Sequence, residues 1–253
     1  MNKGEKNEIL FKVYLCYLKK NNSHKSPFGE IKKLGFGDIE YKILDNDIDF
    51  NTLDDEGVLK EISKKLGIEK SSPKNKADVH INGMGYSIKY MNAAAPSIIN
   101  HTNRKGFLRI ANQLKINISD LDELVNKYWD LRISNQITED CGNNNPLSPF
   151  KDNREILRSY LEYFCFTGTG SSDSKNPADN LIKFNKFDDP SSWRIYSKEN
   201  TVDEIWDGLY FCMRGGRGMD RYKDPNFKKI IEPWTRFTDN KYRGAISVRY
   251  DSK

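Results

Sequence analysis

The sequence predicts a single domain of mixed α and β structure. Segments with apolar residues at helical spacing and short apolar strands follow one another, without the regular strand–helix alternation of a doubly wound parallel sheet. No Pro- or Gly-rich stretch is long enough to separate two domains in the 253 residues. A chain of this length can bury a sizeable core. We therefore expect one domain, mixed α/β or α+β, over residues 1–253.

Two helices and a hairpin are predicted in the first part of the chain. Residues 7–20 carry apolar side chains at helical spacing, and a second helix is expected over residues 54–66, with Gly67 as its stop. Strands are expected over residues 77–81 and 86–91. Two glycines and an asparagine lie between these two apolar runs, which is typical of a hairpin turn.

The later elements alternate between helices, loops and strands. Helices are expected over residues 107–114 and 121–132, from Asp152 to about residue 166, and near Thr201. Residues 141–149 and 168–177 have the composition of loops, and the Gly-rich run 167–172 is expected to be flexible. Strands are expected over residues 181–184, 193–196, 209–214 and 245–250.

The composition excludes several classes of protein. Charged residues make up 30% of the chain, the mean hydropathy is -0.77, and no run of about 18 apolar residues exists, which argues against a membrane protein. Lys12 interrupts the first apolar stretch, so we predict no signal peptide and a cytoplasmic location. Aromatic residues at 12% are too frequent for a disordered chain. The net charge of +5 permits a nucleic-acid partner without establishing one.

The four cysteines do not have the spacing of a metal site. Cys16, Cys141, Cys165 and Cys212 are scattered, and none forms a Cys-x-x-Cys pair. We therefore expect buried or free thiols.

The hairpin carries the most informative pattern of side chains. If its turn is symmetric about Gly83 and Met84, Asp78 lies opposite Lys89. One face is then apolar, with Ala77, Val79, Ile81, Tyr86, Ile88 and Tyr90, and the other is polar, with Asp78, His80, Ser87 and Lys89. His80 is expected to have a structural role more often than a role in the site.

The acid and the amine of this polar face allow two interpretations. A carboxylate suits Mg²⁺, which polarises a phosphoryl oxygen and lowers the pKa of a bound water, while Lys89 orients that water or stabilises the charge that develops on the phosphate. Alternatively, Asp78 and Lys89 form a cross-strand ion pair that contributes about 0.2–1 kcal/mol to stability. The pattern alone leaves both open.

The spacing of Asp78 and Ser87-Ile88-Lys89 resembles the PD-(D/E)XK nuclease motif, and the hairpin is similar to that of type II restriction endonucleases. The resemblance implies a central mixed sheet flanked by helices. It also implies a Mg²⁺-dependent, sequence-specific endonuclease that hydrolyses phosphodiester bonds in double-stranded DNA. Asp78, Ser87, Lys89 and Glu8 would be its catalytic residues, and Asp78, Glu8 and Ile88 would hold the metal.

Ser87 departs from this motif, because it stands where the family usually has an acid. A serine hydroxyl is a weak ligand, so one metal ion suffices or another acid contributes. The family often supplies a Glu from the helix before the hairpin, and Glu8 is the best candidate for it. Alternatively, Glu8 lies in the first turn of its helix and interacts favourably with the helix dipole. Glu61 is a weaker candidate.

Two basic segments are candidate DNA contacts. One segment follows the hairpin and contains His101, Asn103, Arg104 and Lys105, and the other contains Arg214, Arg217 and Arg221 among glycines. Their side chains suit contacts with phosphates and with base edges. The first segment has the alternative interpretation of a solvated loop before a helix.

The expected partner is double-stranded DNA, and the family's usual arrangement is a homodimer with one active site per strand. Two other functions remain open. One is a DNA-binding protein without catalysis, and the other is a structure-selective nuclease of the same fold that acts in repair or recombination.

Overall fold

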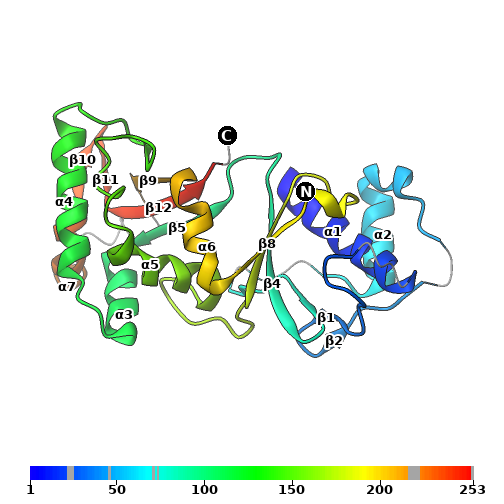
Figure 1. Cartoon of the computed structure of the whole chain (residues 1–253). Helices are drawn as coiled ribbons and strands as arrows, with labels where there is room; N and C mark the ends of the chain where they lie inside the picture. The colour runs from blue at the N-terminus through cyan, green and yellow to red at the C-terminus, as the bar shows by residue number, and fades with distance from the viewer. Residues whose placement is uncertain (22–25, 45–46, 70–71, 73, 216–222, 252–253) are drawn as a thin grey trace. The chain divides into compact units, whose positions relative to one another are not determined.

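The computed structural model describes residues 1–21, 26–44, 47–69, 72, 74–215 and 223–251. The chain divides into two compact units. The first unit comprises Met1–Ala94 and Ser174–Glu199, and the second comprises Ala95–Asp173 and Asn200–Lys253. Figure 1 labels the elements of both. The organisation of residues 1–253 as a single domain stays a prediction.

Six strands form the sheet of the first unit, in the order β2-β1-β3-β4-β7-β8. They are β1 (Leu34–Phe36), β2 (Ile39–Glu40), β3 (Val79–Ile81), β4 (Met84–Tyr90), β7 (Asn180–Phe184) and β8 (Arg194–Ser197). Strands β4 and β7 are parallel, whereas every other pair in this sheet is antiparallel. The predicted mixed α+β class with a central mixed sheet is therefore confirmed.

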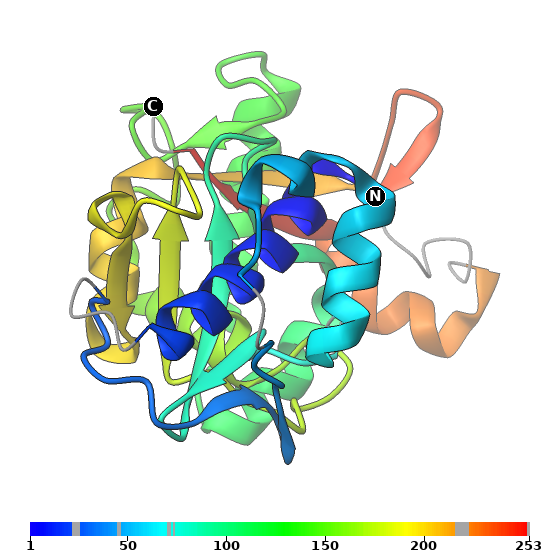
Figure 2. The same cartoon turned by 90° about the vertical axis from the view of Figure 1, so that its right-hand side faces the viewer.

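Two helices accompany this sheet, as the sequence predicts. Helix α1 (Lys3–Lys20) begins earlier than expected, because the Asn2 side chain accepts a hydrogen bond from the backbone amide of Glu5 in a capping box. Helix α2 (Glu56–Leu66) has Asp55 as its N-cap, and it ends at Gly67 in the left-handed conformation. Figure 2 shows α1 lying across the sheet.

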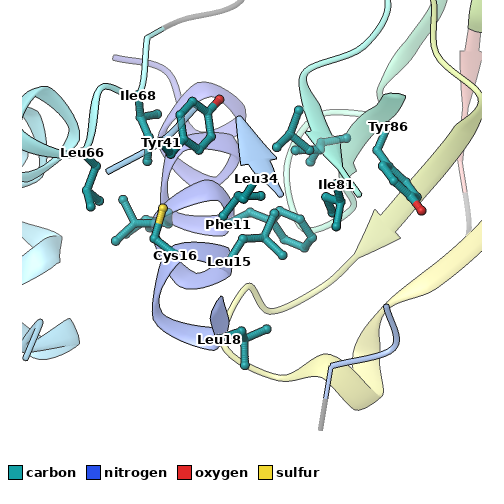
Figure 3. Close-up of a cluster of buried hydrophobic side chains, with 14 of the residues drawn as sticks. Phe11, Leu15, Cys16, Leu18, Leu34, Tyr41, Leu66, Ile68, Ile81 and Tyr86 are labelled. Carbon is teal, nitrogen blue, oxygen red and sulfur yellow. The ribbon is translucent and has the colours of Figure 1, made fainter. Parts of the chain in front are cut away.

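The core of the first unit lies between α1 and the sheet. Phe11 and Leu15 of the helix pack in one cluster with Val79, Ile88 and Ile182 of the strands. Figure 3 shows part of this cluster. The apolar side chains Val79, Ile81, Tyr86 and Ile88 of the hairpin thus pack on α1, as the sequence predicts.

The register of the hairpin differs from the prediction. Ile81 pairs with Met84 and Val79 pairs with Tyr86, so the turn consists of Asn82 and Gly83. Both turn residues have positive φ, 52° and 89°, which is the geometry of a type I′ turn. The predicted pairing was therefore wrong by two residues. A shift of two keeps each paired side chain on its face, so the predicted faces are correct for residues 79–81 and 84–86. The predicted face is wrong at Ala77, because a side chain at Gly85 would lie 3.2 Å from the Ala77 Cβ, on the face of Ser87 and Lys89.

The sheet of the second unit has four antiparallel strands, in the order β5-β12-β9-β6. They are β5 (Ser97–Asn103), β12 (Ala245–Tyr250), β9 (Leu209–Arg214) and β6 (Cys141–Gly142). A separate pair consists of β10 (Arg236–Thr238) and β11 (Lys241–Arg243). Strand β5 includes His101 and Asn103, so the predicted loop at these two residues was wrong.

The remaining elements are helical. The α-helices are α3 (Arg104–Leu114), α4 (Ser119–Ile133), α5 (Arg154–Glu162), α6 (Lys198–Ile205) and α7 (Pro225–Ile231). The short turns of helix are η1 (Phe50–Asp54), the π-helical η2 (Tyr163–Thr167), η3 (Pro190–Ser192), η4 (Trp206–Gly208) and η6 (Glu232–Trp234). None of the helices in the described part of the chain is long and apolar enough to cross a membrane. All four cysteines are buried free thiols, as predicted.

Candidate active site

Asp78 immediately precedes β3 and is held against β4 by two backbone hydrogen bonds. Its amide donates to the carbonyl of Tyr86 over 2.8 Å, and its Oδ2 accepts from the amide of Ile88 over 2.7 Å. A backbone donor to a carboxylate is a strong, directional contact. The carboxylate of Asp78 therefore has a fixed position beside the middle of β4.

Ser87 and Lys89 lie on one face of β4. The paired residues of the hairpin end at Val79, opposite Tyr86, and the amide of Asp78 donates to the carbonyl of the same Tyr86, so Asp78 is not opposite Lys89 as predicted. Ser87 is buried, whereas Lys89 is half-buried and has Lys183 of β7 as its neighbour across the parallel pair.

Glu8 of α1 belongs to the same electrostatic group. Its pKa is raised, first by burial and next by the charge of Asp78, while Lys12 and Lys89 act to lower it. Glu8 Oε1 accepts a hydrogen bond from Lys12 Nζ over 2.6 Å. Three segments far apart in the sequence therefore bring two carboxylates and two ammonium groups within electrostatic range of one another.

The alternative role for Glu8 at the start of its helix was wrong. Helix α1 begins at Lys3, so its first-turn acid is Glu5, and Glu8 lies in the second turn. Glu61, the weaker candidate ligand, lies on the surface of α2 and pairs with Lys65 over 2.7 Å. Its side chain is 67% exposed, which is the solvated helix position expected for it.

Tyr41 is a member of this group that sequence reasoning missed. Its side chain is buried, and among the described residues its hydroxyl has no hydrogen-bond partner. Burial, followed by the charges of Cys16, Glu8 and Asp78, raises the pKa of Tyr41. No motif contains Tyr41, which Figure 3 labels in the buried cluster around α1. Only this position in the fold brings it within electrostatic range of the two carboxylates.

The donor set fits a magnesium ion. Within the residues described here, no group of three or more His, Cys, Asp or Glu side chains is arranged to hold a metal. Mg²⁺ needs only one or two protein carboxylates, because it keeps several waters and takes further oxygens from a substrate phosphate. Asp78 and Glu8 supply two such groups, and the unpartnered Tyr41 hydroxyl is a polar group suited to a metal-bound water. The side chain of Ile88 is apolar and buried, so only its backbone carbonyl could be a ligand.

The first predicted DNA-contact segment borders a cavity of about 550 Å³ within the second unit. His101, Lys105, Arg109 and the backbone at Gly170 line it. Asn103 caps helix α3, where its Oδ1 accepts from the amide of Gly106. Arg104 instead binds the carboxylate of Asp122 through two hydrogen bonds of 2.8 and 2.6 Å, so the structure gives it an intramolecular partner.

His101 has an unusual backbone. Its φ is +42°, and the register shift between Ile246 and Val248 leaves residues 100–101 opposite Ser247, as in a β-bulge. Burial, followed by the charges of Arg214 and Arg249, lowers the pKa of His101, so its ring is neutral at pH 7. A neutral imidazole can both donate and accept a hydrogen bond at the edge of the cavity.

The second predicted DNA-contact segment is only partly described. Arg214 binds Glu139 over 2.6 Å and Asp140 over 2.8 Å, and these two ion pairs hold its guanidinium in place. Arg217 and Arg221 lie outside the described residues.

The Gly-rich run 167–172 has several hydrogen bonds within the second unit, and its predicted flexibility stays a prediction. Gly168 pairs with Asp173, and the amide of Thr169 donates to the carbonyl of Ser172 over 2.8 Å. Arg109 of α3 donates to the carbonyls of Thr169 and Gly170. The hydroxyl of Tyr163 donates to Asp173 over 2.6 Å.

His80 has a structural partner, as expected. The amide of Gly37 donates to its Nδ1 over 3.2 Å, which links the hairpin to the loop between β1 and β2. His24 lies outside the described residues.

Comparisons with known proteins give no family for this chain. No protein-family model matches it, and no curated protein matches it. Among solved structures, the chain is similar to a crystal structure of restriction endonuclease MspI in complex with its cognate DNA. The two share 13% sequence identity over 78% of this chain and 79% of that one, with a TM-score of 0.34. A likeness this weak carries no argument about function.

Proposed function

We propose that this chain is a Mg²⁺-dependent endonuclease that hydrolyses phosphodiester bonds in double-stranded DNA. The observation that supports it most is that Asp78 and Lys89 of the hairpin both act on the pKa of Glu8 of α1, while the amide of Ile88 holds the Asp78 carboxylate in place over 2.7 Å. Carboxylates that share a site with a lysine are suited to holding a divalent ion against a phosphate. The resemblance of the hairpin to type II restriction endonucleases points the same way.

Each residue has a distinct role in this proposal. Asp78 and Glu8 hold the metal, with the backbone carbonyl of Ile88 as a further oxygen. Bound Mg²⁺ would polarise the phosphoryl oxygen and lower the pKa of the attacking water. The ammonium of Lys89 orients that water and stabilises negative charge on the phosphate. Ser87 is the remaining proposed catalytic residue, at the position where the motif usually has an acid.

DNA recognition is assigned to the second unit in this proposal. Lys105 is exposed beside the cavity and can bind a phosphate, and the neutral ring of His101 can bind a base edge. Asn103, Arg104, Arg214, Arg217 and Arg221 are the remaining proposed contacts. Sequence-specific cleavage of the type II kind, and a homodimer with one active site per strand, complete the proposal.

The deciding experiment is a plasmid digest in Mg²⁺. We expect the wild-type protein to give discrete fragments, and Asp78→Ala or Lys89→Ala to abolish cleavage while the protein remains folded and binds DNA. Lys183→Ala is the matched control, because Lys183 is the neighbour of Lys89 on the same face of the sheet, and we expect it to retain most of the activity.

Other outcomes of the digest would support other functions. A plasmid that is retarded in a gel but remains intact would indicate a DNA-binding protein without catalysis. Cleavage of branched DNA alone would indicate a structure-selective nuclease. Wild-type cleavage by Lys89→Ala would exclude the proposed site.

A further inference from the structure

Among the described residues of the first unit, Lys12 is the most deeply buried charged residue. Its side chain is fully buried in helix α1, although lysine is almost never found so deep without a partner. Glu8, one turn earlier, accepts a hydrogen bond from its ammonium over 2.6 Å. The amine of Lys12 is therefore fixed beside a carboxylate that we propose as a metal ligand.

A contribution to the stability of the fold does not by itself explain why the Lys12–Glu8 ion pair is buried. A buried ion pair loses its hydration, and well-packed apolar side chains of similar volume are often as stabilising or more so. By contrast, Lys19 and Glu40 form a pair with the same 2.6 Å separation, but there the carboxylate side chain is 64% exposed. The burial of the Lys12 pair sets it apart from the surface pairs of the same helix.

The formal charges of Glu8 and of the three groups that act on its pKa cancel. Glu8 and Asp78 contribute two negative charges, and Lys12 and Lys89 contribute two positive charges. One divalent ion would then be balanced by one phosphate diester and one attacking hydroxide. A second divalent ion would leave an excess of positive charge in a site of low dielectric, where uncompensated charge is costly.

We propose that Lys12 is an internal cation that occupies one of two cation positions at the Glu8–Asp78 pair. The site consequently takes a single divalent ion, held mainly by Asp78. Lys12 is a positioning residue here, since it acts through Glu8 and does not touch the substrate. This inference rests on the proposed function, because it concerns the metal of that same site.

The test counts bound ions by the loss of the free Mn²⁺ signal in electron paramagnetic resonance. Mn²⁺ is suitable because it takes the same oxygen ligands as Mg²⁺. The specific sites are those that disappear in Asp78→Asn. We expect one such ion per chain in the wild-type protein. In Lys12→Met, which keeps an unbranched side chain as far as the ε position and removes the ammonium, we expect a second ion or affinity increased roughly tenfold or more.

Lys19→Met is the matched control, because it removes the same group from the exposed pair on the same helix. It should leave both the number of ions and their affinity as in the wild-type protein. Circular dichroism checks that each variant is folded. If Lys12→Met does not fold, the number of Asp78-dependent ions bound by the wild-type protein tests the role of Lys12 by itself.

The outcomes separate the two proposals. Two Asp78-dependent ions in the wild-type protein would overturn the role of Lys12 and leave the nuclease proposal intact. If Lys12→Met is folded and binds the same number of ions with the same affinity as the wild-type protein, the role of Lys12 is also overturned and the nuclease proposal stands. Ions whose binding does not depend on Asp78, or no binding at all, would overturn the proposed metal site itself, and the role of Lys12 with it.

Discussion

At the scale of single residues, the candidate site depends on groups whose surroundings the sequence does not show. Asp78 and Lys89 are found from their spacing, and Glu8 from its place on the preceding helix. Tyr41 and Lys12 belong to no motif, and only the fold reveals that both are buried beside Glu8. The free-energy cost of a polar group in the folded state depends more on whether the group is buried without a partner than on its residue type.

The first prediction concerns the hydroxyl of Tyr41. A buried hydroxyl without a partner costs about 1–3 kcal/mol. In metal-free protein we therefore expect Tyr41→Phe to raise the free energy of unfolding, and the melting temperature by about 2–4 °C for each kcal/mol. Cleavage should fall, because the metal-bound water loses a partner. Tyr160→Phe is the control, since Tyr160 in the second unit also has a buried hydroxyl without a partner among the described residues.

Melting curves and the plasmid digest measure the two effects separately. We expect both variants to be stabilised and only Tyr41→Phe to lose activity. Equal activity of the two variants would remove Tyr41 from the site.

At the scale of elements, the sequence predicts those with strong periodicity and misses those without it. Helices α1 and α2 and strands β9 and β12 lie close to where their patterns predict them. Strand β5 was missed, because its second half is the polar run Asn100-His101-Thr102-Asn103, which has the composition of a loop. Strands β1 and β2 were missed because they have only three and two residues. The faces of the paired residues of the hairpin were predicted correctly, whereas its register was decided by the turn, and the alternation does not continue to Ala77.

The second prediction concerns the loop that ends at Asp173. The pKa of Asp173 is lowered by hydrogen bonds from Tyr163, Gln113 and Arg109. A carboxyl group whose pKa is lower in the folded state stabilises the fold above its ordinary pKa of about 3.9, and loses this effect as the pH falls through the lowered value. At pH 7 we expect Asp173→Asn to cost about 1 kcal/mol, because the side chain is half exposed.

Thermal melts in a pH series measure this difference. The gap between wild type and Asp173→Asn should be widest near pH 7 and should shrink toward low pH, where the wild-type carboxylate becomes protonated. Asp152→Asn, at an exposed position, is the control. A gap that is constant with pH would show that Asp173 acts through packing and not through its charge.

At the scale of the whole molecule, the proposed catalytic residues and the proposed DNA contacts belong to different units. Glu8, Asp78, Ser87 and Lys89 are in the first unit, and His101, Asn103, Lys105 and Arg214 are in the second. Among these contacts, the described arginines already have acidic partners. Lys105 is exposed and is therefore the best placed to bind a phosphate.

The third prediction is that Lys105→Glu weakens DNA binding at all sequences. Because one phosphate contact is lost, the slope of log K against log salt concentration should become less steep by about one. Lys115→Glu makes the same change of charge at the other end of helix α3, and we expect no change in slope. A salt titration of binding to a short duplex measures both variants. An unaltered slope in Lys105→Glu would place the phosphate contacts elsewhere.

The parallel pairing of β4 with β7 has a consequence for how the chain reaches its native state. These neighbouring strands are separated in the sequence by Ala95–Asp173, a large part of the second unit, while residues 174–199 interrupt that unit in turn. During synthesis on the ribosome, the six-stranded sheet therefore cannot be completed until β7 and β8 have been synthesised. The four-stranded sheet cannot be completed until β9 and β12 have been synthesised. Pairings between such distant segments form slowly. We accordingly expect the nascent chain to need protection from aggregation until nearly all of it has emerged.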